Sequence, residues 1–326
     1  MKFVFVMDPY ETLNLETETS LLLMDELLAR GHRVFWLGQE DIFLQHHIPM
    51  GLVAEVRAIN PFEKEPSEQA SLNDFDAVLT RIDPPFDQNY LHLTYIFDFL
   101  DESVVQFNPV KALRNFNEKM LPLRWPGFVP ATLVTQNKQQ ILAFIAEHSN
   151  IVVKPLDDCS GRGVVKLSAQ QSDLEQVLSA SLLNAFGQPQ VLQAQRFLPE
   201  VSEGDKRVYL VNGEPVGVVN RLPQKGNFLA NIHQGARCEA SDLSIRERHI
   251  IETIKPFLLE QGIFLVGLDF IGGYITEINI TSPSAIRQIN EVSGAEVHKL
   301  IVDGMLERLA GRHEVWCCGA PLRRVI

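Results

Sequence analysis

Two glycine-centred turns constrain the fold of the carboxyl-terminal half of the chain more than any other feature. One is Asn212-Gly213 in DKRVYLVNGEPVGVVNRL, and the other is Gly272-Gly273 in FLVGLDFIGGYITEINI. An Asn-Gly or Gly-Gly pair between two apolar runs is a strong short-range signal of a β-hairpin with a two-residue turn. The sequence therefore predicts two antiparallel hairpins in this half.

The amino-terminal 115 residues show a different pattern, in which short apolar runs alternate with helical segments. The runs at residues 2–7, 33–37, 77–82 and 104–107 predict strands, and TSLLLMDELLARG and NYLHLTYIFDFLDE predict helices between them. Such alternation is typical of a parallel α/β sheet. We expect residues 60–74, NPFEKEPSEQASLND, to form a polar insertion or loop.

The middle of the chain predicts a smaller α+β unit, which follows a hinge rich in Pro and Gly, LRWPGFVPATLVT. Strands are predicted in IVVKPL, GVVKL and QVLQAQRFL, and amphipathic helices in NKQQILAFIAEHS and DLEQVLSASLLNAF. We therefore expect units at residues 1–120, 121–200 and 201–312, followed by a tail at 313–326.

The charge balance argues against a general binder of nucleic acids or anionic membranes. The chain has 41 acidic and 29 basic residues in 326, a formal net charge of -12. The first apolar run ends at Asp8 and Pro9, too early for a signal peptide, and no apolar run is long enough to span a bilayer. The four cysteines include no C-x-x-C pair. We expect a cytoplasmic protein with reduced thiols.

The second hairpin carries oxygen donors suited to a divalent cation. Glu277 and Asn279 are two residues apart and share one face of a strand, and the paired strand can bring Asp269 beside them. Mg²⁺ prefers a few carboxylates together with phosphate oxygens. The alternative is the solvated face of an ordinary strand, but Ile278 and Ile280 indicate that this strand is largely buried.

The segment IVVKPLDDCSGRGVVKL predicts a phosphate site in which the lysine precedes the glycines. Lys154 lies in an apolar strand, where its charge needs an anion, and Gly161 and Gly163 free backbone N–H groups that could fold over phosphates as a lid. Taken alone, the pattern fits an ordinary hairpin loop better than a phosphate site. The hairpin with Asp269, Glu277 and Asn279 further along the chain favours a nucleotide-binding site over an ordinary loop.

The first hairpin carries charged residues that fit the same picture. Asp205 and Arg207 share a face of one strand, so the acid could bind a ribose hydroxyl and the guanidinium could stabilise a transferring phosphoryl group. Arg221 lies at the end of the partner strand and can reach the same pocket. A cross-strand ion pair is the alternative for each of these residues.

The order of NFNEKML, VVKPLDDCSGRG, QRFLPEVSEGDKR and GLDFIGGYITEINITSP resembles the ATP-grasp ligases, most closely the prokaryotic glutathione synthetase family. The segments VMDP and RIDPPFDQNYLHLTYIFDFL also look like that family, and the resemblance covers nearly all of residues 1–310. It implies an ATP-grasp fold after an amino-terminal parallel α/β domain. Residues 121–200 would be the lid domain and residues 201–312 the catalytic domain.

The resemblance also implies roles for individual residues. Asp205 would contact the ribose of ATP, and Arg207, Lys154 and Arg221 would be catalytic. Mg²⁺, with Mn²⁺ as a possible substitute, would be bound by Asp269, Glu277 and Asn279. The phosphates and the adenine would be held by Lys119, Lys154, Gly161, Gly163, Gln195, Arg196, Phe197 and Leu198.

By the same resemblance, the enzyme would phosphorylate the cysteinyl carboxylate of γ-glutamylcysteine, and the amine of glycine would then displace phosphate. Substrate contacts are expected from Arg81, Asp83, Asn231 and Arg287, together with Arg207 and Arg221. For Arg81 and Asp83 an ion pair at a domain interface is an equal alternative. The family also implies a homo-oligomer, a tetramer or a dimer.

Two departures from the family pattern leave the acceptor open. Two glycines of the family's loop are replaced in Asp157-Asp158-Cys159-Ser160-Gly161, and Leu229 stands where the family carries an arginine near the phosphate. The alternatives are therefore another ATP-grasp carboxylate–amine ligase with a different acceptor, or a nucleotide-binding regulator without turnover. The retained charged residues argue against the regulator.

Overall fold

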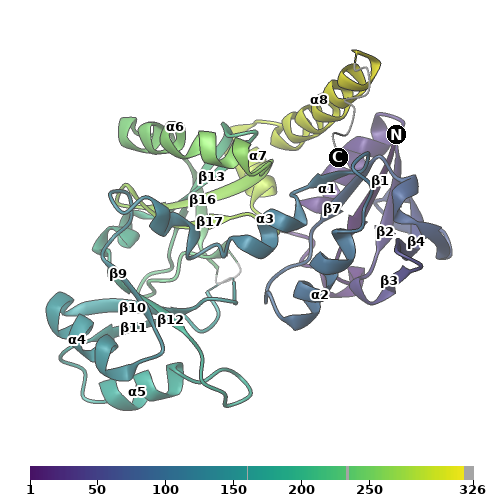
Figure 1. The fold of residues 1–326 in the computed structure, drawn as a ribbon. Coiled ribbons are helices and arrows are strands. Elements are labelled where there is room, and N and C mark those ends of the chain that lie inside the picture. Colours follow the sequence, from purple (N-terminus) through teal and green to yellow (C-terminus); the bar gives the residue numbers. More distant parts are fainter. Residues whose placement is uncertain (160, 233–234, 319–326) are drawn as a thin grey trace.

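The computed structural model describes residues 1–159, 161–232 and 235–318, without the side chains of 312–318, and three β-sheets organise this part of the chain (Figure 1). The amino-terminal sheet has eight strands and contains the predicted parallel core, in the order β2-β1-β7-β8. Its strands and helices are β1 (Lys2–Val6), α1 (Ser20–Ala29), β2 (Arg33–Leu37), β7 (Ala77–Thr80), α2 (Gln88–Phe97) and β8 (Val105–Phe107).

Four antiparallel strands that the sequence did not predict extend this sheet beyond β2: β3 (Ile42–Gln45), β4 (Ile48–Ile59), β5 (Phe62–Lys64) and β6 (Glu68–Ser71). Of the two expectations for residues 60–74, a loop is therefore wrong, and the segment is a polar insertion that contains two short strands. The long strand β4 supplies hydrogen-bond partners for both short strands, and Phe62 stacks on Tyr10 with ring centroids 4.2 Å apart. Backbone pairing and one aromatic anchor thus order a segment that is otherwise polar.

The middle of the chain forms a separate four-stranded sheet in the order β11-β10-β12-β9, with two helices, and lies apart from the amino-terminal sheet in Figure 1. Its elements are β9 (Thr132–Thr135), α4 (Lys138–His148), β10 (Asn150–Pro155), β11 (Val165–Ser168), α5 (Leu174–Ser181) and β12 (Leu192–Arg196). It has its own small apolar core, which includes Ile141, Ile151 and Leu192. The other two sheets share hydrophobic clusters with each other, in which Phe5, for example, belongs with Tyr209.

The third sheet is antiparallel, in the order β15-β14-β13-β16-β17, and it confirms both predicted hairpins. Its strands and helices are β13 (Asp205–Val211), β14 (Glu214–Leu222), β15 (Arg237–Ala240), α6 (Ile245–Glu260), β16 (Leu265–Ile271), β17 (Tyr274–Asn279), α7 (Ile286–Ser293) and α8 (Val297–Cys318). Helix α8 continues across the expected boundary at residue 312, and residues 319–326 of the predicted tail lie outside the described residues.

Both hairpins contain a β-bulge between their turn and their charged residues. In the first, the register shifts by one residue between Tyr209 and Leu210, and in the second it shifts between Asp269 and Phe270. A bulge places two residues of one strand opposite one of the other, so it changes which side chains share a face.

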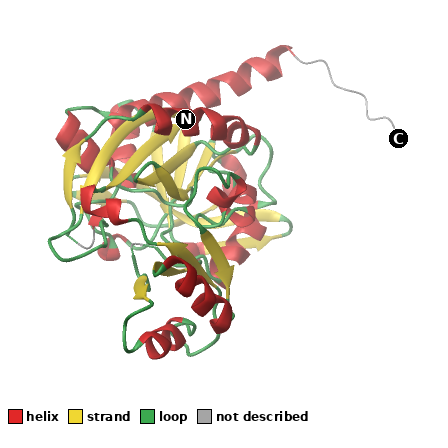
Figure 2. Ribbon diagram, turned by 90° about the vertical axis from the view of Figure 1, so that its left-hand side faces the viewer, coloured by secondary structure: helices red, strands yellow, loops and turns green. Residues whose placement is uncertain are grey.

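Short elements lie in the connections within and between the sheets: η1 (Tyr10–Thr12), η2 (Gln39–Asp41), η3 (Leu72–Asp74), α3 (Val110–Asn115), η4 (Leu121–Arg124) and η5 (Pro199–Glu203). Figure 2 shows the helices packed on the outside of the sheets, with the long helix α8 along one side of the molecule. None of the helices in the described part is both long and apolar enough to cross a membrane.

Asn108 joins the amino-terminal sheet to the third sheet. It follows β8 and is buried, and its amide Nδ2 donates to Leu265 O at 2.7 Å and Ile280 O at 2.8 Å. Its Oδ1 accepts from the N–H groups of Phe264 at 2.7 Å and Leu265 at 2.9 Å. One side chain therefore satisfies four buried backbone groups where β16 begins and β17 ends.

Candidate active site

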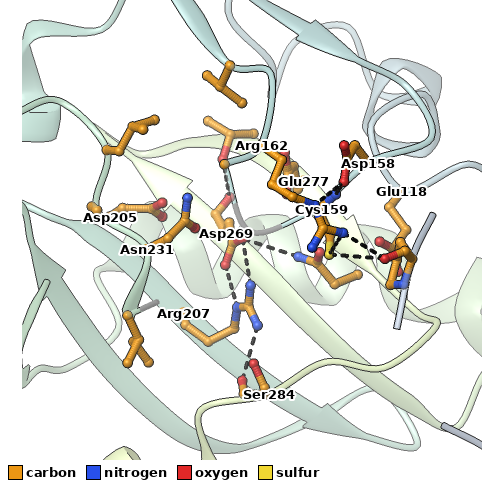
Figure 3. A pocket seen from close by; sticks show the side chains of 18 of the residues that line it. Glu118, Asp158, Cys159, Arg162, Asp205, Arg207, Asn231, Asp269, Glu277 and Ser284 are labelled. Carbon is orange, nitrogen blue, oxygen red and sulfur yellow. Dashed lines mark hydrogen bonds and ion pairs between the residues drawn. The ribbon is translucent and has the colours of Figure 1, made fainter. Parts of the chain in front are cut away.

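A cavity of about 850 Å³ is lined by residues of the second and third sheets and by loops that follow strands of the amino-terminal sheet; Figure 3 shows part of its wall. Every predicted site residue except Gly163 and Arg287 belongs to its wall. The residues therefore come together from segments far apart in the sequence. Which of them contact a ligand remains a prediction.

Strand register explains the charged cluster at the centre of the cavity. Asp205 is the direct cross-strand partner of Arg221, and Arg207 is the direct partner of Asp269. Arg207 Nε and NH2 lie 2.5 and 2.8 Å from the two Asp269 oxygens, as Figure 3 shows. Arg221 NH2 lies 2.8 Å from Asp205 Oδ1 and 2.9 Å from Asp269 Oδ1, in ion pairs outside hydrogen-bond geometry. The ion pairs considered as the alternative are thus present within the cavity wall.

The pKa values of the two carboxylates in this cluster shift in opposite directions. Burial raises the pKa of Asp205 to about 6, although Arg221 opposes the effect. Burial would also raise the pKa of Asp269, but Arg207 and Arg221 outweigh it and hold this pKa at about 2. Both arginines remain charged. The cluster therefore presents two fixed cations to the cavity, as an anionic phosphoryl group requires.

Asp269 is surrounded by donors and cations in this arrangement. Arg207 donates to both of its oxygens, Asn279 Nδ2 donates to its Oδ2 at 3.2 Å, and Arg221 forms an ion pair with its Oδ1. Since three hydrogen bonds and this ion pair occupy the space around the two oxygens, a metal ion could bind Asp269 only after one of these side chains turned away. Asp269 as a ligand remains a prediction that requires such a movement.

Glu277 and Asn279 fit a divalent cation without that movement. Glu277 lies opposite Asp269 in the register, and Lys154 Nζ, at 3.7 Å from its Oε1, is the one described cation paired with it. Asn279 donates through Nδ2 to Gly267 O at 3.0 Å, which fixes its amide so that Oδ1 is the end left for a cation. No group of three or more His, Cys, Asp or Glu side chains in the described residues could hold a metal alone. Mg²⁺ needs only one or two carboxylates beside phosphate oxygens and water, so the donor set fits it.

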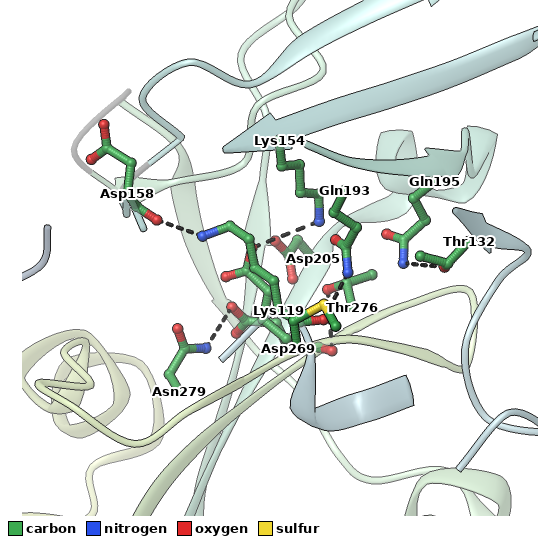
Figure 4. Close-up of polar contacts among 12 residues, drawn as sticks. Lys119, Thr132, Lys154, Asp158, Gln193, Gln195, Asp205, Asp269, Thr276 and Asn279 are labelled. Atoms are coloured by element: carbon green, nitrogen blue, oxygen red, sulfur yellow. Dashed lines mark hydrogen bonds and ion pairs between the residues drawn. The ribbon is translucent and has the colours of Figure 1, made fainter. Parts of the chain in front are cut away.

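Lys119 and Lys154 approach the cavity from different sides (Figure 4). Lys119 is buried and donates through Nζ to Asp158 O at 2.5 Å, while its own carbonyl accepts from Gln193 Nε2 at 2.7 Å. Lys154 points from β10 toward Glu277. Two ammonium groups thus lie near the loop that the sequence predicts to cover phosphates.

That loop requires glycine for two physical reasons. Gly161 and Gly163 have φ values of +77° and +67°, which disfavour any side chain. A Cβ on Gly161 would come within 2.5 Å of Asn231 Nδ2, and one on Gly163 within 2.7 Å of the Pro155 ring. The loop therefore fits closely against the segment that carries Asn231.

We expect Gly161→Ala to lower kcat/KM about tenfold, since the loop must move away from Asn231 and cover the cavity less well. Gly187→Ala is the matched control, because Gly187 has a similar φ of +73° but nothing within 4 Å of its added Cβ. Steady-state kinetics and thermal unfolding of both variants separate the effect of moving the loop from the effect of strain in the backbone. Equal loss of activity in the two variants would show that backbone strain alone is responsible.

Contacts that the sequence did not predict hold the same loop against the amino-terminal sheet. Arg162 NH2 donates to Pro84 O at 2.8 Å, and Arg162 Nε is 2.6 Å from Asp158 Oδ1. Phe86 N–H donates to Asp157 O at 3.1 Å. The loop in this structure therefore lies closed against the residues that follow β7.

The predicted adenine end of the cavity lies at the end of β12. Gln195, Arg196, Phe197 and Leu198 line it. Gln195 Nε2 donates to Thr132 Oγ1 at 3.2 Å, and Lys166 Nζ lies 3.7 Å from the centre of the Phe197 ring. Backbone groups at a strand end beside an aromatic ring suit a planar base that needs hydrogen bonds.

The predicted substrate residues separate into two groups. Arg81, Asp83 and Asn231 line the cavity. Arg287 lies on α7 outside the wall, where its Nε donates to Glu18 O at 3.3 Å. This position gives no support to the prediction that Arg287 contacts a substrate.

Glu118 is a wall residue that the sequence reading missed. Its Oε1 accepts from Ile280 N at 2.6 Å and from both the N–H and the hydroxyl of Thr281 at 2.8 Å. These bonds position the end of β17, next to Asn279. The only signal in the sequence was its place beside Lys119 in NFNEKML.

Comparisons with known proteins identify the family of the chain. The family model for the amino-terminal domain of prokaryotic glutathione synthetase matches residues 1–114, and the model for its ATP-grasp domain matches residues 118–294. A glutathione synthetase of Nitrosomonas europaea is 34% identical over 322 residues, which cover 96% of this chain and 100% of that protein.

Solved structures show the same fold at low identity. D-cycloserine synthetase DcsG has a TM-score of 0.66 at 14% identity, covering 94% of this chain and 99% of its own. The ATP-grasp ligase PsnB, complexed with minimal precursor, Mg and ADP, has a TM-score of 0.61 at 16% identity, covering 95% and 98%. The chain has the ATP-grasp fold and belongs to the prokaryotic glutathione synthetase family.

Proposed function

We propose that this protein is an ATP-dependent carboxylate–amine ligase that joins γ-glutamylcysteine to glycine and yields glutathione, ADP and phosphate. The proposal rests on one observation: the cations Lys154, Arg207 and Arg221 line the same cavity as Glu277 and Asn279, which offer oxygen atoms to a metal ion. Family membership over nearly the whole chain supports the choice of substrates.

The chemistry must make an unreactive carboxylate electrophilic. An oxygen of the cysteinyl carboxylate attacks the γ-phosphorus of ATP, and ADP leaves. The glycine amine then attacks the acyl carbon, the C–O bond to phosphate breaks, and the amine loses a proton as the amide forms. Arg207 and Arg221 stabilise the negative charge on the transferring phosphoryl group, and their buried pairing with Asp269 keeps them in place.

The remaining residues bind ATP and exclude water. Lys119 and Lys154 contact the phosphates, the loop with Gly161 and Gly163 covers them, and Asp205 takes the ribose. Glu277 and Asn279, with Asp269 after rearrangement, would hold Mg²⁺ or Mn²⁺, and such a cation would supply charge neutralisation at the phosphates. A closed loop protects the acyl phosphate from hydrolysis.

The second candidate is the same activation chemistry with a different acceptor, and Leu229 in the cavity wall favours it. An apolar side chain there removes a cation that the family resemblance implies. Incubating the enzyme with ATP, γ-glutamylcysteine and single amino acids decides between the two. Phosphate release that depends on glycine supports glutathione synthesis, and release that depends on another amine contradicts it.

We expect Glu277→Gln to lower kcat by about 10²–10³-fold at saturating ATP, since it removes the carboxylate best placed to hold the cation. The substitution keeps the side-chain volume, so the unfolding temperature should stay close to wild type. Glu239→Gln, at an exposed site on the edge strand β15 of the same sheet, is the control. Full activity of the Glu277 variant at limiting Mg²⁺ would exclude Glu277 as a ligand.

We also propose that the protein works in the cytoplasm as a homotetramer or homodimer, on small molecules rather than on nucleic acid or membranes. The net charge of -12 supports the exclusion of anionic polymers and surfaces. We retain the division into units at residues 1–120, 121–200 and 201–312 as part of this proposal.

A further inference from the structure

Three carboxylates occupy the amino-terminal end of the cavity: Asp8, Glu18 and Asp83. Asp8 follows β1 and Asp83 follows β7, and these strands are adjacent and parallel, so the two acids meet at the carboxyl edge of the sheet. Asp83 N–H donates to Asp8 Oδ2 at 2.9 Å. Glu18 lies just before α1, and its Oε1 accepts from Ser20 N at 2.6 Å.

This edge is the topological switch point of the sheet. In the order β2-β1-β7-β8, the chain leaves β1 toward β2 on one side and later returns to β7 on the other side. The connections therefore diverge and leave a crevice at the carboxyl ends of β1 and β7, where ligands bind in open α/β sheets. The three acids lie where the fold itself predicts a small-molecule contact.

These carboxylates lack the ion-pair partners that four other carboxylates of the cavity wall have. None of the three forms an ion pair with a residue that the structure describes. By contrast, Asp158, Asp205, Asp269 and Glu277 pair with Arg162, Arg221, Arg207 and Lys154, respectively. The four paired carboxylates thus lie toward the second and third sheets, and the three carboxylates without ion pairs form an acidic end toward the amino-terminal sheet.

The acids also disfavour one another's charge. Burial raises the pKa of Asp8, and Glu18 and Glu40 raise it further, while backbone N–H groups oppose the effect. Burial and Glu18 likewise raise the pKa of Asp83, while a hydrogen bond with Ser282 and the charge of Arg81 oppose the effect. A bound cation would relieve this repulsion.

An organic cation fits this end better than a metal ion. The three acids are not a group that could hold a metal, according to the geometry of the described side chains. Arg81 lies in the same wall and is only 4% exposed, with Nε bonded to Ser20 Oγ and NH2 to Pro283 O. Its NH1 has no hydrogen-bond partner among the described residues. Carboxylates beside a buried guanidinium suit a ligand that carries an ammonium and a carboxylate together.

We propose that Asp8, Glu18 and Asp83 bind the α-ammonium group of the γ-glutamyl residue and that its α-carboxylate is directed toward Arg81. This assignment rests on the proposed function, in which the reacting cysteinyl carboxylate lies beside Arg207 and Arg221. The amino-acid end of the same dipeptide must then extend away from the phosphates. The acidic end of the cavity discriminates substrates by the charge of that distant group.

The test compares γ-glutamylcysteine with glutarylcysteine, which differs only by lacking the α-amino group. Kinetics with each donor are measured for wild type, Asp83→Asn and Asp8→Asn, at saturating ATP and glycine. Asp74→Asn, at an exposed position of the same domain outside the cavity, is the matched control. Calorimetric Kd values for the two donors in the absence of ATP provide a readout that does not require turnover.

We expect wild type and the control to prefer γ-glutamylcysteine at least 100-fold in kcat/KM. For Asp83→Asn, kcat/KM with γ-glutamylcysteine should fall at least tenfold, mainly because KM rises. With glutarylcysteine kcat/KM should change little, so the ratio of the two kcat/KM values should decrease. A variant that unfolds loses activity with both donors, and Asp8→Asn then supplies the comparison.

Equal losses with the two donors in folded variants, or an effect confined to the KM for glycine, would overturn the assignment while leaving the proposed function intact. A wild-type enzyme that ligates neither donor would overturn the proposed function, and the assignment with it.

Discussion

Replacing Arg207 with methionine is expected to lower kcat/KM by about 10³-fold and the free energy of unfolding by about 3–5 kcal/mol. The activity falls because the transferring phosphoryl group loses a fixed cation. Stability falls because Asp269, only 4% exposed and held at a pKa of about 2 by two arginines, keeps its charge with one partner missing. Chemical denaturation and initial-rate kinetics of the same preparation measure both effects.

Two comparison variants make this expectation specific. Arg237→Met removes an arginine from β15 in the same sheet, where the side chain is 74% exposed and its ion pair with Glu239 contributes little. It should change stability by less than about 1 kcal/mol. Arg207→Lys retains a charge but not the bidentate contact and should recover stability more than activity. A stable, active Arg207→Met enzyme would refute the role of the pair.

Replacing Asn108 with alanine is expected to lower the free energy of unfolding by about 4 kcal/mol or more without touching the cavity. Four buried backbone hydrogen bonds, to Phe264, Leu265 and Ile280, depend on this one amide. Each unsatisfied buried group costs about 1–3 kcal/mol, and water entering the space recovers part of the loss. Thermal and urea unfolding measure the effect.

The control for Asn108 is Asn89→Ala, an exposed asparagine of α2, which should leave stability within about 0.5 kcal/mol of wild type. Asn108→Asp adds a second test, since it keeps the acceptor for Phe264 and Leu265 but loses both donors. It should also be strongly destabilising. An Asn108→Ala protein as stable as wild type would mean that the backbone of β16 finds other partners.

The sequence predicted the elements that local patterns determine. Alternating apolar runs with Gly213 and Gly273 in the turns were sufficient for both hairpins, and a buried parallel sheet follows from strands separated by helices. The sequence did not predict β5 and β6, because these segments form strands through pairing with β4 and not through their own composition.

The acidic end of the cavity could not be predicted for a different reason. Asp8 and Asp83 are separated by an insertion of four strands, and only the pairing of β1 with β7 brings them together. Likewise, the bonds from Glu118 to Ile280 and Thr281 join segments more than 160 residues apart. Periodicity and turn signals carry no information about contacts of that range.

The two bulges have a consequence for how such an enzyme can change. In an unbulged hairpin around Asn212-Gly213, Asp205 would oppose Asn220, and Arg221 would lie on the other face; the shift at Tyr209 brings Arg221 opposite Asp205 instead. The shift at Asp269 does the same for Glu277. The number of residues between the turn and the cavity thus fixes the register of each hairpin. Removing one of these residues would turn the charged side chains of that strand to the opposite face of the sheet, away from the cavity. The number of residues between turn and cavity is therefore as much a part of the site as the charged side chains themselves.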